Sequence, residues 1–279
     1  MASPPEVIAH RGGTADAPEN TVTAIRHALE NGADTIWVTL QLSGDKQIVL
    51  YRPSDLKVLT NRAGPVSAFN ADVLQNTDAG WAFTKDNGKS YPFRGKGIGI
   101  PTLETVLTLF PNTPFYLDIK SPDAEPDNFG QILLATLKKN RSLARIRVYS
   151  TDTRYIQALP AEIPRFETRD GTRTVLANIT MAHQCPLVAE AETTRWFGLE
   201  LRREVRVVEK YTLGEGVSPA YLTWDKEAMA CFRAKGQARI ILFGINSARD
   251  YQTAVELGAD GVLVDSPRET KTYARKPVK

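Results

Sequence analysis

The segment VIAHRGG at residues 7–13 places two basic side chains directly after a short apolar run, and APENT follows at 17–21. The apolar run at 6–9 predicts a β-strand, and the glycines after it indicate a turn. From 20 to 30, apolar residues recur at the spacing of one buried helical face, which predicts a helix that Gly32 ends. The chain therefore begins with a strand, a loop and a helix, the unit from which parallel sheets are built.

The same alternation of short apolar runs and helical patterns continues along the chain. Further strands are expected at 35–42, 47–51, 115–119, 146–150, 165–168, 239–243 and 261–264, and further helices at 103–110, 129–138, 155–159, 226–234 and 249–257. Strands that alternate with helices are typical of a parallel sheet covered by helices. A length of 279 residues fits one (β/α)8 TIM barrel, which takes about 250. We therefore predict an α/β fold, a single-domain TIM barrel over residues 1–279.

Two stretches depart from this pattern. Residues 53–100 are rich in Gly, Asn and Asp without long periodicity, so we predict a long inserted loop region after the third strand, with at most short elements. Its aromatic side chains form either a lid beside a ligand or the small core of an ordered loop; they are Trp81, Phe83, Tyr91 and Phe93. Residues 170–236 show no clear pattern apart from extended character at 196–208 and the helix at 226–234.

Composition and charge exclude several classes of protein. With 42% hydrophobic and 24% charged residues, the chain has the composition of a globular protein with a sizeable core. The formal net charge is only +3, and Lys and Arg are dense only at 271–279, so no nucleic-acid partner is expected. No apolar run approaches the roughly 20 residues that cross a bilayer, so no integral membrane segment is expected.

The cysteines and the start of the chain leave two questions open. Cys185 and Cys231 lie far apart and lack metal-ligand spacing, so they are either two buried thiols or one disulfide. The opening Met-Ala-Ser-Pro-Pro is compatible with a cytoplasmic protein, and equally with a periplasmic or secreted one whose signal peptide is not in this sequence. Nothing in the sequence indicates an oligomeric state.

Short motifs are spread over nearly the whole chain. His-Arg-Gly at 10–12 and Pro-Glu-Asn-Thr at 18–21 are followed by further pieces at 31–34, 101–104, 117–120, 244–246 and 258–265. In order and spacing they resemble the glycerophosphodiester phosphodiesterase (GDPD) family, whose first strand ends in His-Arg-Gly. The resemblance implies a TIM barrel of the phospholipase-C-like phosphodiesterase type. It also implies a phosphoric diester hydrolase of lipid metabolism.

His10 and Arg11 are the strongest candidates for chemistry. Both end the first strand, and the carboxyl ends of barrel strands surround the active site. A histidine transfers protons at neutral pH, and a planar guanidinium holds two phosphate oxygens. The competing interpretation is a core histidine beside a surface ion pair, and the neighbouring motifs favour the catalytic one. Glu19 is expected to bond to Arg11 or a ligand hydroxyl, or else to be an ordinary helix-start residue.

The resemblance also implies a divalent cation, and here the sequence departs from the family. Relatives bind the cation through a Glu-x-Asp pair on the second strand and an acidic residue on the fourth, at positions that are Trp37, Thr39 and Asp118 in this chain. The third strand ends in Tyr51 and Arg52 where the family has its second catalytic histidine. One carboxylate and one hydroxyl are a thin ligand set for a hard cation. The sequence therefore predicts a degenerate metal site.

We accordingly expect a site with no cofactor and little or no metal dependence. Calcium or magnesium is expected only if Asp118 is joined by Glu167 or Glu200. Arg52 brings a permanent positive charge to the place of the cation, and a guanidinium neutralises phosphate charge as a metal does. Glu167 and Arg169 end a predicted strand, and they are expected either to line the mouth of the barrel or to form an ion pair between strands.

The resulting hypothesis is a phosphodiesterase-like site for a small or lipid-derived phosphodiester. His10 is the general acid or base, and Tyr51 supplies a proton to the leaving group, although a pKa near 10 makes tyrosine a weak substitute for histidine. The expected phosphate and substrate contacts are Arg11, Glu19, Arg52, Asp118, Lys120, Glu167 and Trp37. His183 is a minor candidate for the missing histidine. The alternative is a catalytically inactive barrel that binds a phosphorylated ligand or a protein partner, with Trp37 filling the former metal cavity.

Overall fold

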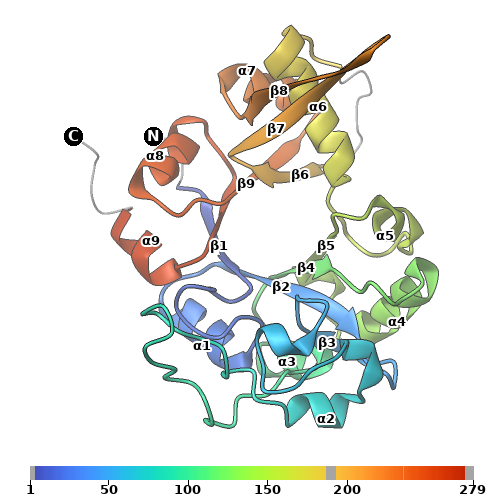
Figure 1. Cartoon of the computed structure of the whole chain (residues 1–279), viewed down its shortest axis with the longest axis vertical. Coiled ribbons are helices and arrows are strands. Elements are labelled where there is room, and N and C mark those ends of the chain that lie inside the picture. Colours follow the sequence, from blue (N-terminus) through green and yellow to red (C-terminus); the bar gives the residue numbers. More distant parts are fainter. Residues whose placement is uncertain (1–3, 187–192, 235, 274–279) are drawn as a thin grey trace.

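A curled sheet of parallel strands forms the centre of the protein (Figure 1). The computed structural model describes residues 4–186, 193–234 and 236–273. The strands follow the order β5-β4-β2-β1-β10-β9-β6 around the sheet, and each neighbouring pair is parallel. They are β1 (Glu6–His10), β2 (Thr35–Leu42), β4 (Phe115–Ile119), β5 (Ile146–Tyr149), β6 (Arg195–Glu200), β9 (Ala238–Phe243) and β10 (Gly261–Val264).

A short extended segment closes the ring between β5 and β6. The amide of Phe166 donates to the Val148 carbonyl of β5 at 2.9 Å, and the amide of Glu167 donates to the Trp196 carbonyl of β6 at 2.8 Å. This segment was predicted as a strand at 165–168, and it occupies the eighth place around the ring. The prediction of an α/β fold with a parallel barrel is therefore confirmed.

Helices cover the outside of the ring (Figure 1). The first, α1, begins after Thr21, whose hydroxyl accepts a hydrogen bond from the Ala24 amide at 3.1 Å, and it buries Ala24, Ile25 and Ala28 as the apolar spacing predicted. The helices are α1 (Val22–Glu30), α3 (Leu103–Leu109), α4 (Pro126–Lys139), α5 (Thr153–Ala158), α6 (Arg169–Ala182), α7 (Lys226–Arg233), α8 (Ala248–Glu256) and α9 (Pro267–Tyr273). No described helix is long and apolar enough to span a membrane.

The inside of the barrel is filled by side chains that alternate along the strands. A buried layer is formed by Ile8, Trp37, Tyr116, Tyr149, Phe166, Ile241 and Leu263. Because successive residues of a strand point to opposite faces, the residue two positions further on also points inward, one step closer to the carboxyl end. That rule sends His10, Thr39, Asp118 and Asp265 into the mouth of the barrel.

The segment between β3 and α3 is folded without long elements. β3 (Ile48–Leu50) pairs antiparallel with β2 and is not a parallel barrel strand, because the few residues between them allow only a tight turn. Beyond it lie η1 (Leu56–Val58), η2 (Val66–Ala68) and α2 (Ala71–Gln75). Buried apolar side chains of this segment form their own cluster, and the Phe83 and Phe93 rings pack edge to face at 5.2 Å. This contact favours the small-core interpretation for Phe83 and Phe93, whereas Trp81 and Tyr91 are exposed.

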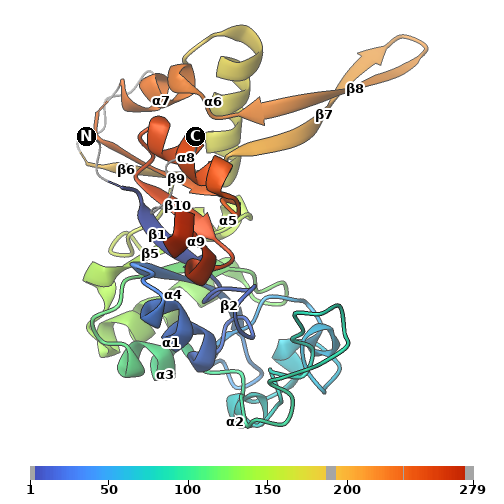
Figure 2. The ribbon, with the colours of Figure 1, turned by 90° about the vertical axis from the view of Figure 1, so that its left-hand side faces the viewer.

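A projecting β-hairpin is the largest element that the sequence did not predict (Figure 2). It consists of β7 (Arg202–Tyr211) and β8 (Gly214–Thr223), paired antiparallel over their whole length. The extended character expected at 196–208 covers β6 and part of β7. Most residues of the hairpin are exposed on both faces, so its sequence lacks the apolar alternation that marks a half-buried strand.

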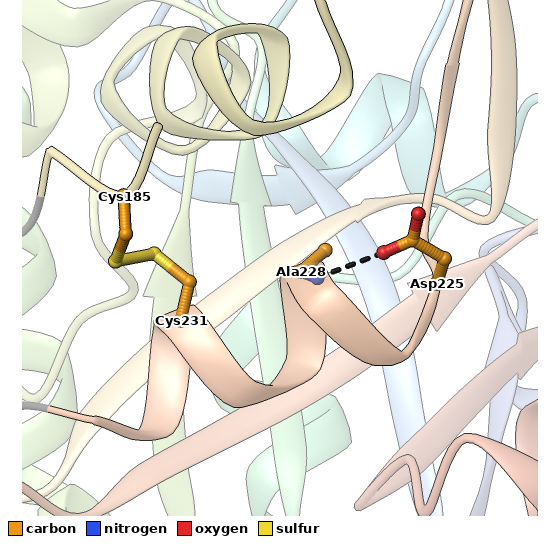
Figure 3. Close-up of a disulfide and its surroundings, with 4 residues drawn as sticks. All are labelled: Cys185, Asp225, Ala228 and Cys231. Carbon is orange, nitrogen blue, oxygen red and sulfur yellow. Dashed lines mark hydrogen bonds between the residues drawn. A yellow bond between two sulfur atoms is a disulfide. The ribbon is translucent and has the colours of Figure 1, made fainter. Parts of the chain in front are cut away.

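The two cysteines form one disulfide (Figure 3). Cys185 follows α6 and Cys231 lies on α7, so the bond joins these two helices across 46 residues of sequence. The start of α7 is capped by Asp225, whose carboxylate accepts a hydrogen bond from the Ala228 amide at 2.8 Å. The alternative of two free thiols is therefore wrong.

Candidate active site

His10 is held by a carboxylate at the mouth of the barrel. Its Nδ1 lies 2.6 Å from Oδ1 of Asp265, the residue that follows β10. The other oxygen of Asp265 accepts a hydrogen bond from the Asn246 side chain at 2.6 Å. Burial opposes ionisation of Asp265, but the hydrogen bonds from His10 and Asn246 keep its pKa below the usual value. An ionised Asp265 fixes the proton on Nδ1 and turns Nε2 of His10 into the acceptor.

Arg11 is positioned by the loop that leads to α1. Its backbone has a φ of +51°, in the left-handed region, and its carbonyl accepts a hydrogen bond from the Asn20 amide at 2.8 Å. Its guanidinium donates to Glu19 at 2.8 Å. The Asn20 side chain in turn accepts from the backbone amide of Thr39 at 2.9 Å. The Pro-Glu-Asn-Thr motif therefore ties the first loop to β2 and orients Arg11 toward the mouth.

Asp118 and Lys120 lie next to each other on the floor of the mouth. Nζ of Lys120 donates to Oδ1 of Asp118 at 3.2 Å and to the Thr151 hydroxyl at 3.1 Å. Burial raises the pKa of Asp118, while the positive charges of Lys120, Arg11 and His10 oppose that rise. The carboxylate is only 6% exposed and is engaged by the lysine.

A cavity of about 390 Å³ lies above this floor. Most of its lining is charged, with Arg11, Arg52, Lys120, Arg169 and Arg203 as cations and Asp118, Glu200 and Asp265 as anions. A second cavity of about 360 Å³ shares three of its lining residues, Arg52, Lys120 and Thr151. The two cavities together form a two-lobed opening with an excess of positive charge, which suits a phosphodiester anion.

Trp37 fills the centre of the floor. Its ring packs against Tyr149 at 5.0 Å and Phe243 at 5.2 Å, and only 3% of the residue is exposed. Several buried polar atoms around it have no protein partner among the described residues. They are the indole Nε1 of Trp37, Oγ1 of Thr39, Nε of Arg11, Oε1 of Glu19, Nδ2 of Asn20 and Oε2 of Glu200. Buried polar groups are normally satisfied, so this cluster indicates water or a ligand at the site.

These residues do not fit the divalent cation that the family resemblance implies. The second strand presents an indole and a hydroxyl at the ligand positions, and the Asp118 carboxylate is bonded to Lys120. In the described ranges, no group of three or more His, Cys, Asp or Glu side chains is placed to hold a metal ion. A hard cation needs several oxygen ligands, so this donor set is insufficient.

Four sequence candidates do not line the cavity. Glu19 bonds to Arg11 behind it, and Tyr51, Glu167 and His183 are engaged elsewhere. The Tyr51 hydroxyl donates to the carbonyls of Asp55 and Leu56 at 3.2 and 3.0 Å, and burial raises its pKa far above the usual value. The structure therefore gives it no role in protonating a leaving group. Tyr51 belongs to the small core of the 53–100 segment, where it is buried with Leu56 and Leu74.

Glu167 and His183 are also engaged elsewhere. Glu167 follows the inward-pointing Phe166, so it faces outward, where its carboxylate accepts from Nε of Arg195 at 2.9 Å. This is the ion pair between strands that was its second interpretation. His183 ends α6 and bonds to Glu227 of α7 at 2.9 Å, with its side chain 78% exposed. Neither residue lines the cavity.

Asp265 and Arg203 line the cavity and were not predicted as residues of the site. Asp265 lies two positions after Leu263 on the same face of the strand, so the alternation of β10 was the signal that pointed to it. Arg203 comes from the base of the unpredicted hairpin, and its guanidinium donates to Glu200 at 2.8 Å. Arg169 donates to the same carboxylate oxygen at 3.2 Å. Glu200, which the sequence singled out only as a metal ligand, is thus neutralised by two arginines.

A parallel barrel that carries a histidine, a lysine and several arginines at its carboxyl-end mouth has a site suited to binding phosphate groups. A model of the Glycerophosphoryl diester phosphodiesterase family matches residues 10–269. The chain belongs to this family.

Relatives and solved structures cover nearly the whole chain. The uncharacterized protein Rv2277c of Mycobacterium tuberculosis is 39% identical over 94% of this chain and 87% of its own length. The crystal structure of its glycerophosphoryl diester phosphodiesterase domain matches with a TM-score of 0.90 over 98% of this chain and 100% of that chain, at 36% identity. A glycerophosphodiester phosphodiesterase of Bacillus subtilis is 24% identical over 93% of this chain and 83% of its own length. An Oleispira antarctica phosphodiesterase, solved with sn-glycerol-3-phosphate, shares the fold, with a TM-score of 0.69 over 98% of this chain and 97% of that chain, at 18% identity.

Proposed function

We propose that this protein hydrolyses a small or lipid-derived phosphodiester, with little or no dependence on a divalent cation. The observation that carries the proposal is the His10–Asp265 pair at 2.6 Å, set at the rim of a cavity rich in cations. A histidine held by a carboxylate is a general base, and the surrounding guanidinium and ammonium groups bind phosphate oxygens.

The chemistry is assigned to the chain's own residues. The phosphate lies between Arg11, Arg52 and Lys120, which spread positive charge around its oxygens. Nε2 of His10 takes the proton of the attacking oxygen as that oxygen forms a bond to phosphorus. The bond between phosphorus and the oxygen of the leaving alcohol breaks, and the Lys120 ammonium donates a proton to that oxygen. Asp265 stabilises the imidazolium that forms on His10.

Arg52 takes the part that a cation plays in other members of the family. It lines both lobes of the opening and forms none of the ion pairs found among the described residues. A guanidinium without a carboxylate partner is available to a phosphate, and its charge does not depend on pH. This availability separates Arg52 from Arg11 and Lys120, which each have an acidic neighbour.

One observation favours a second candidate function. The Trp37 ring fills the floor of the cavity at a position where relatives carry the metal-binding Glu-x-Asp pair. A barrel that binds phosphorylated ligands without turnover would have such a floor. Hydrolysis of an aryl phosphodiester and of glycerophosphocholine, measured with chelator, with calcium and with magnesium, separates the two functions.

The matched variants are His10→Ala and His183→Ala, because the second removes an exposed histidine outside the cavity. Turnover that survives chelation, is lost in His10→Ala and is kept in His183→Ala supports the enzyme. Phosphate binding without turnover in any condition supports the binding protein. Activity that appears only with added cation contradicts the metal-independent part of the proposal.

A further inference from the structure

Exposed apolar side chains are concentrated on two segments of the chain. Ten large hydrophobic residues are prominently exposed among those described, and eight of them lie on the hairpin or on the 53–100 segment. They are Val208, Tyr211, Leu213, Val217 and Tyr221 on the hairpin, and Val58, Trp81 and Tyr91 on the segment. Leu213, in the turn of the hairpin, is 100% exposed. Exposed apolar groups gathered in this way mark an interaction surface.

Both segments stand on the same side of the molecule as the active-site mouth. The hairpin leaves directly from the carboxyl end of β6, and the 53–100 segment follows β3, which pairs with the end of β2 that extends beyond the barrel. Figure 2 shows the two projecting in the same direction. Each also contributes to the cavity, through Arg203 at the base of the hairpin and Arg52 just before the segment. The two segments therefore flank the opening, and together they form what we name the mouth-side face.

The chemistry of this face matches an anionic lipid surface. Tryptophan and tyrosine are the aromatic residues that favour the boundary between lipid and water. Trp81 and Tyr91 are both stacked on the Arg94 guanidinium, at 4.1 and 3.7 Å, so apolar rings and positive charge are presented together. The segment carries six Lys and Arg against four Asp, and residues 202–223 carry four against three Glu. Cationic residues near an anionic membrane add to apolar insertion.

We propose that the mouth-side face docks on an anionic lipid surface, so that the active site takes its phosphodiester from lipid head groups in that surface. The substrate class rests on the proposed function, whereas the docking does not. A fluid surface can contact two separate projections at once. A second copy of this chain would instead need a continuous complementary patch, and the apolar residues are divided between two sides of an opening.

The test is flotation with vesicles of phosphatidylcholine and phosphatidylglycerol, compared with phosphatidylcholine alone. Leu213→Asp removes the fully exposed apolar tip, and Leu109→Asp is the matched control, because Leu109 is 46% exposed at the end of α3 that leads into β4, on the opposite side of the barrel. On docking, Leu213 would be buried in lipid, and loss of this burial predicts a fall of about tenfold or more in the partition coefficient of Leu213→Asp. No fall is expected in the control. Vesicle binding by His10→Ala protein is expected to equal that of the unmodified protein, so the docking is tested even where turnover fails.

Three results would overturn the proposal. One is failure of the unmodified protein to float with either vesicle. Another is an equal loss of binding in both leucine variants. The third is a concentration-dependent dimer in light scattering, abolished by Leu213→Asp and unaccompanied by vesicle binding, which would assign the face to a second copy. With soluble glycerophosphocholine as substrate, Leu213→Asp is expected to keep full activity, and loss there would show damage to the site.

Discussion

Replacement of Asp265 by asparagine tests the central element of the site. Both neighbours of this carboxylate are donors, the Nδ1 of His10 and the side-chain amide of Asn246, each at 2.6 Å. An asparagine side chain accepts hydrogen bonds only at its oxygen. Its amide nitrogen, which is itself a donor, therefore faces one of the two donors. His10 then shifts its proton to Nε2 and can no longer accept one there. General base catalysis contributes about 10²–10⁴-fold, and we expect kcat to fall by about that factor in Asp265→Asn.

The assay is the hydrolysis of an aryl phosphodiester, with Glu167→Gln as the matched control. Glu167 pairs with Arg195 outside the cavity, so its amide variant is expected to keep kcat within about twofold. Activity of Asp265→Asn within about threefold of the unmodified protein would refute the assigned role of the carboxylate. An equal loss in both variants would indicate a general fault in folding.

The same variant makes a prediction on stability and pH. The pKa of Asp265 is lowered in the folded protein, so its ionised form stabilises the fold above the ordinary pKa of an aspartate, 3.8. That contribution is lost as the pH falls through the lower folded pKa. Denaturant unfolding should therefore show a gap in stability between the unmodified protein and Asp265→Asn at pH 7, and the gap should close below pH 3.8.

Three further predictions follow from individual contacts. Arg52→Met should lower kcat/KM about 10- to 100-fold in the presence of chelator, because charged hydrogen bonds to phosphate are lost, whereas unchanged kinetics would remove Arg52 from the site. Tyr51→Phe should keep activity within about twofold and lower the free energy of unfolding by ~1 kcal/mol, because the hydroxyl bonds only to backbone carbonyls; a large loss of kcat would restore Tyr51 as a proton donor. Cys185→Ser should lower the free energy of unfolding by about 3–4 kcal/mol under oxidising conditions, measured by denaturant unfolding, and equal stability with and without reductant in the unmodified protein would contradict this.

The barrel was predictable because its signals are local. Strand and helix periodicities depend on neighbouring residues, and the helix at 20–30 and the strand at 261–264 are close to their observed bounds in α1 and β10. The hairpin was not predictable, because a ribbon exposed on both faces has no buried side to impose alternation. β3 has the residues of a strand, but its antiparallel pairing depends on the turn that connects it to β2.

The site was predictable only in part, for a related reason. His10 and Asp118 end strands, and in a barrel those ends converge whatever the intervening sequence. Tyr51 was misplaced because β3 runs antiparallel and carries its side chain into the small core, which the motif spacing does not encode. Arg203 lies in the stretch at 196–208 that was expected only as extended, and that pattern neither separated the hairpin from β6 nor linked Arg203 to Glu200.

The disulfide also determines how the chain would respond to a protease. Cys185 and Cys231 enclose β6, the whole hairpin and most of α7 in one covalent loop, and the fully exposed Leu213 lies at the tip of that loop. Exposed turns are preferred cleavage sites. A cut beside Leu213 would leave two pieces that stay joined through sulfur. Such a clipped molecule would migrate as one species without reductant and as two with it, and its barrel would keep every strand in place.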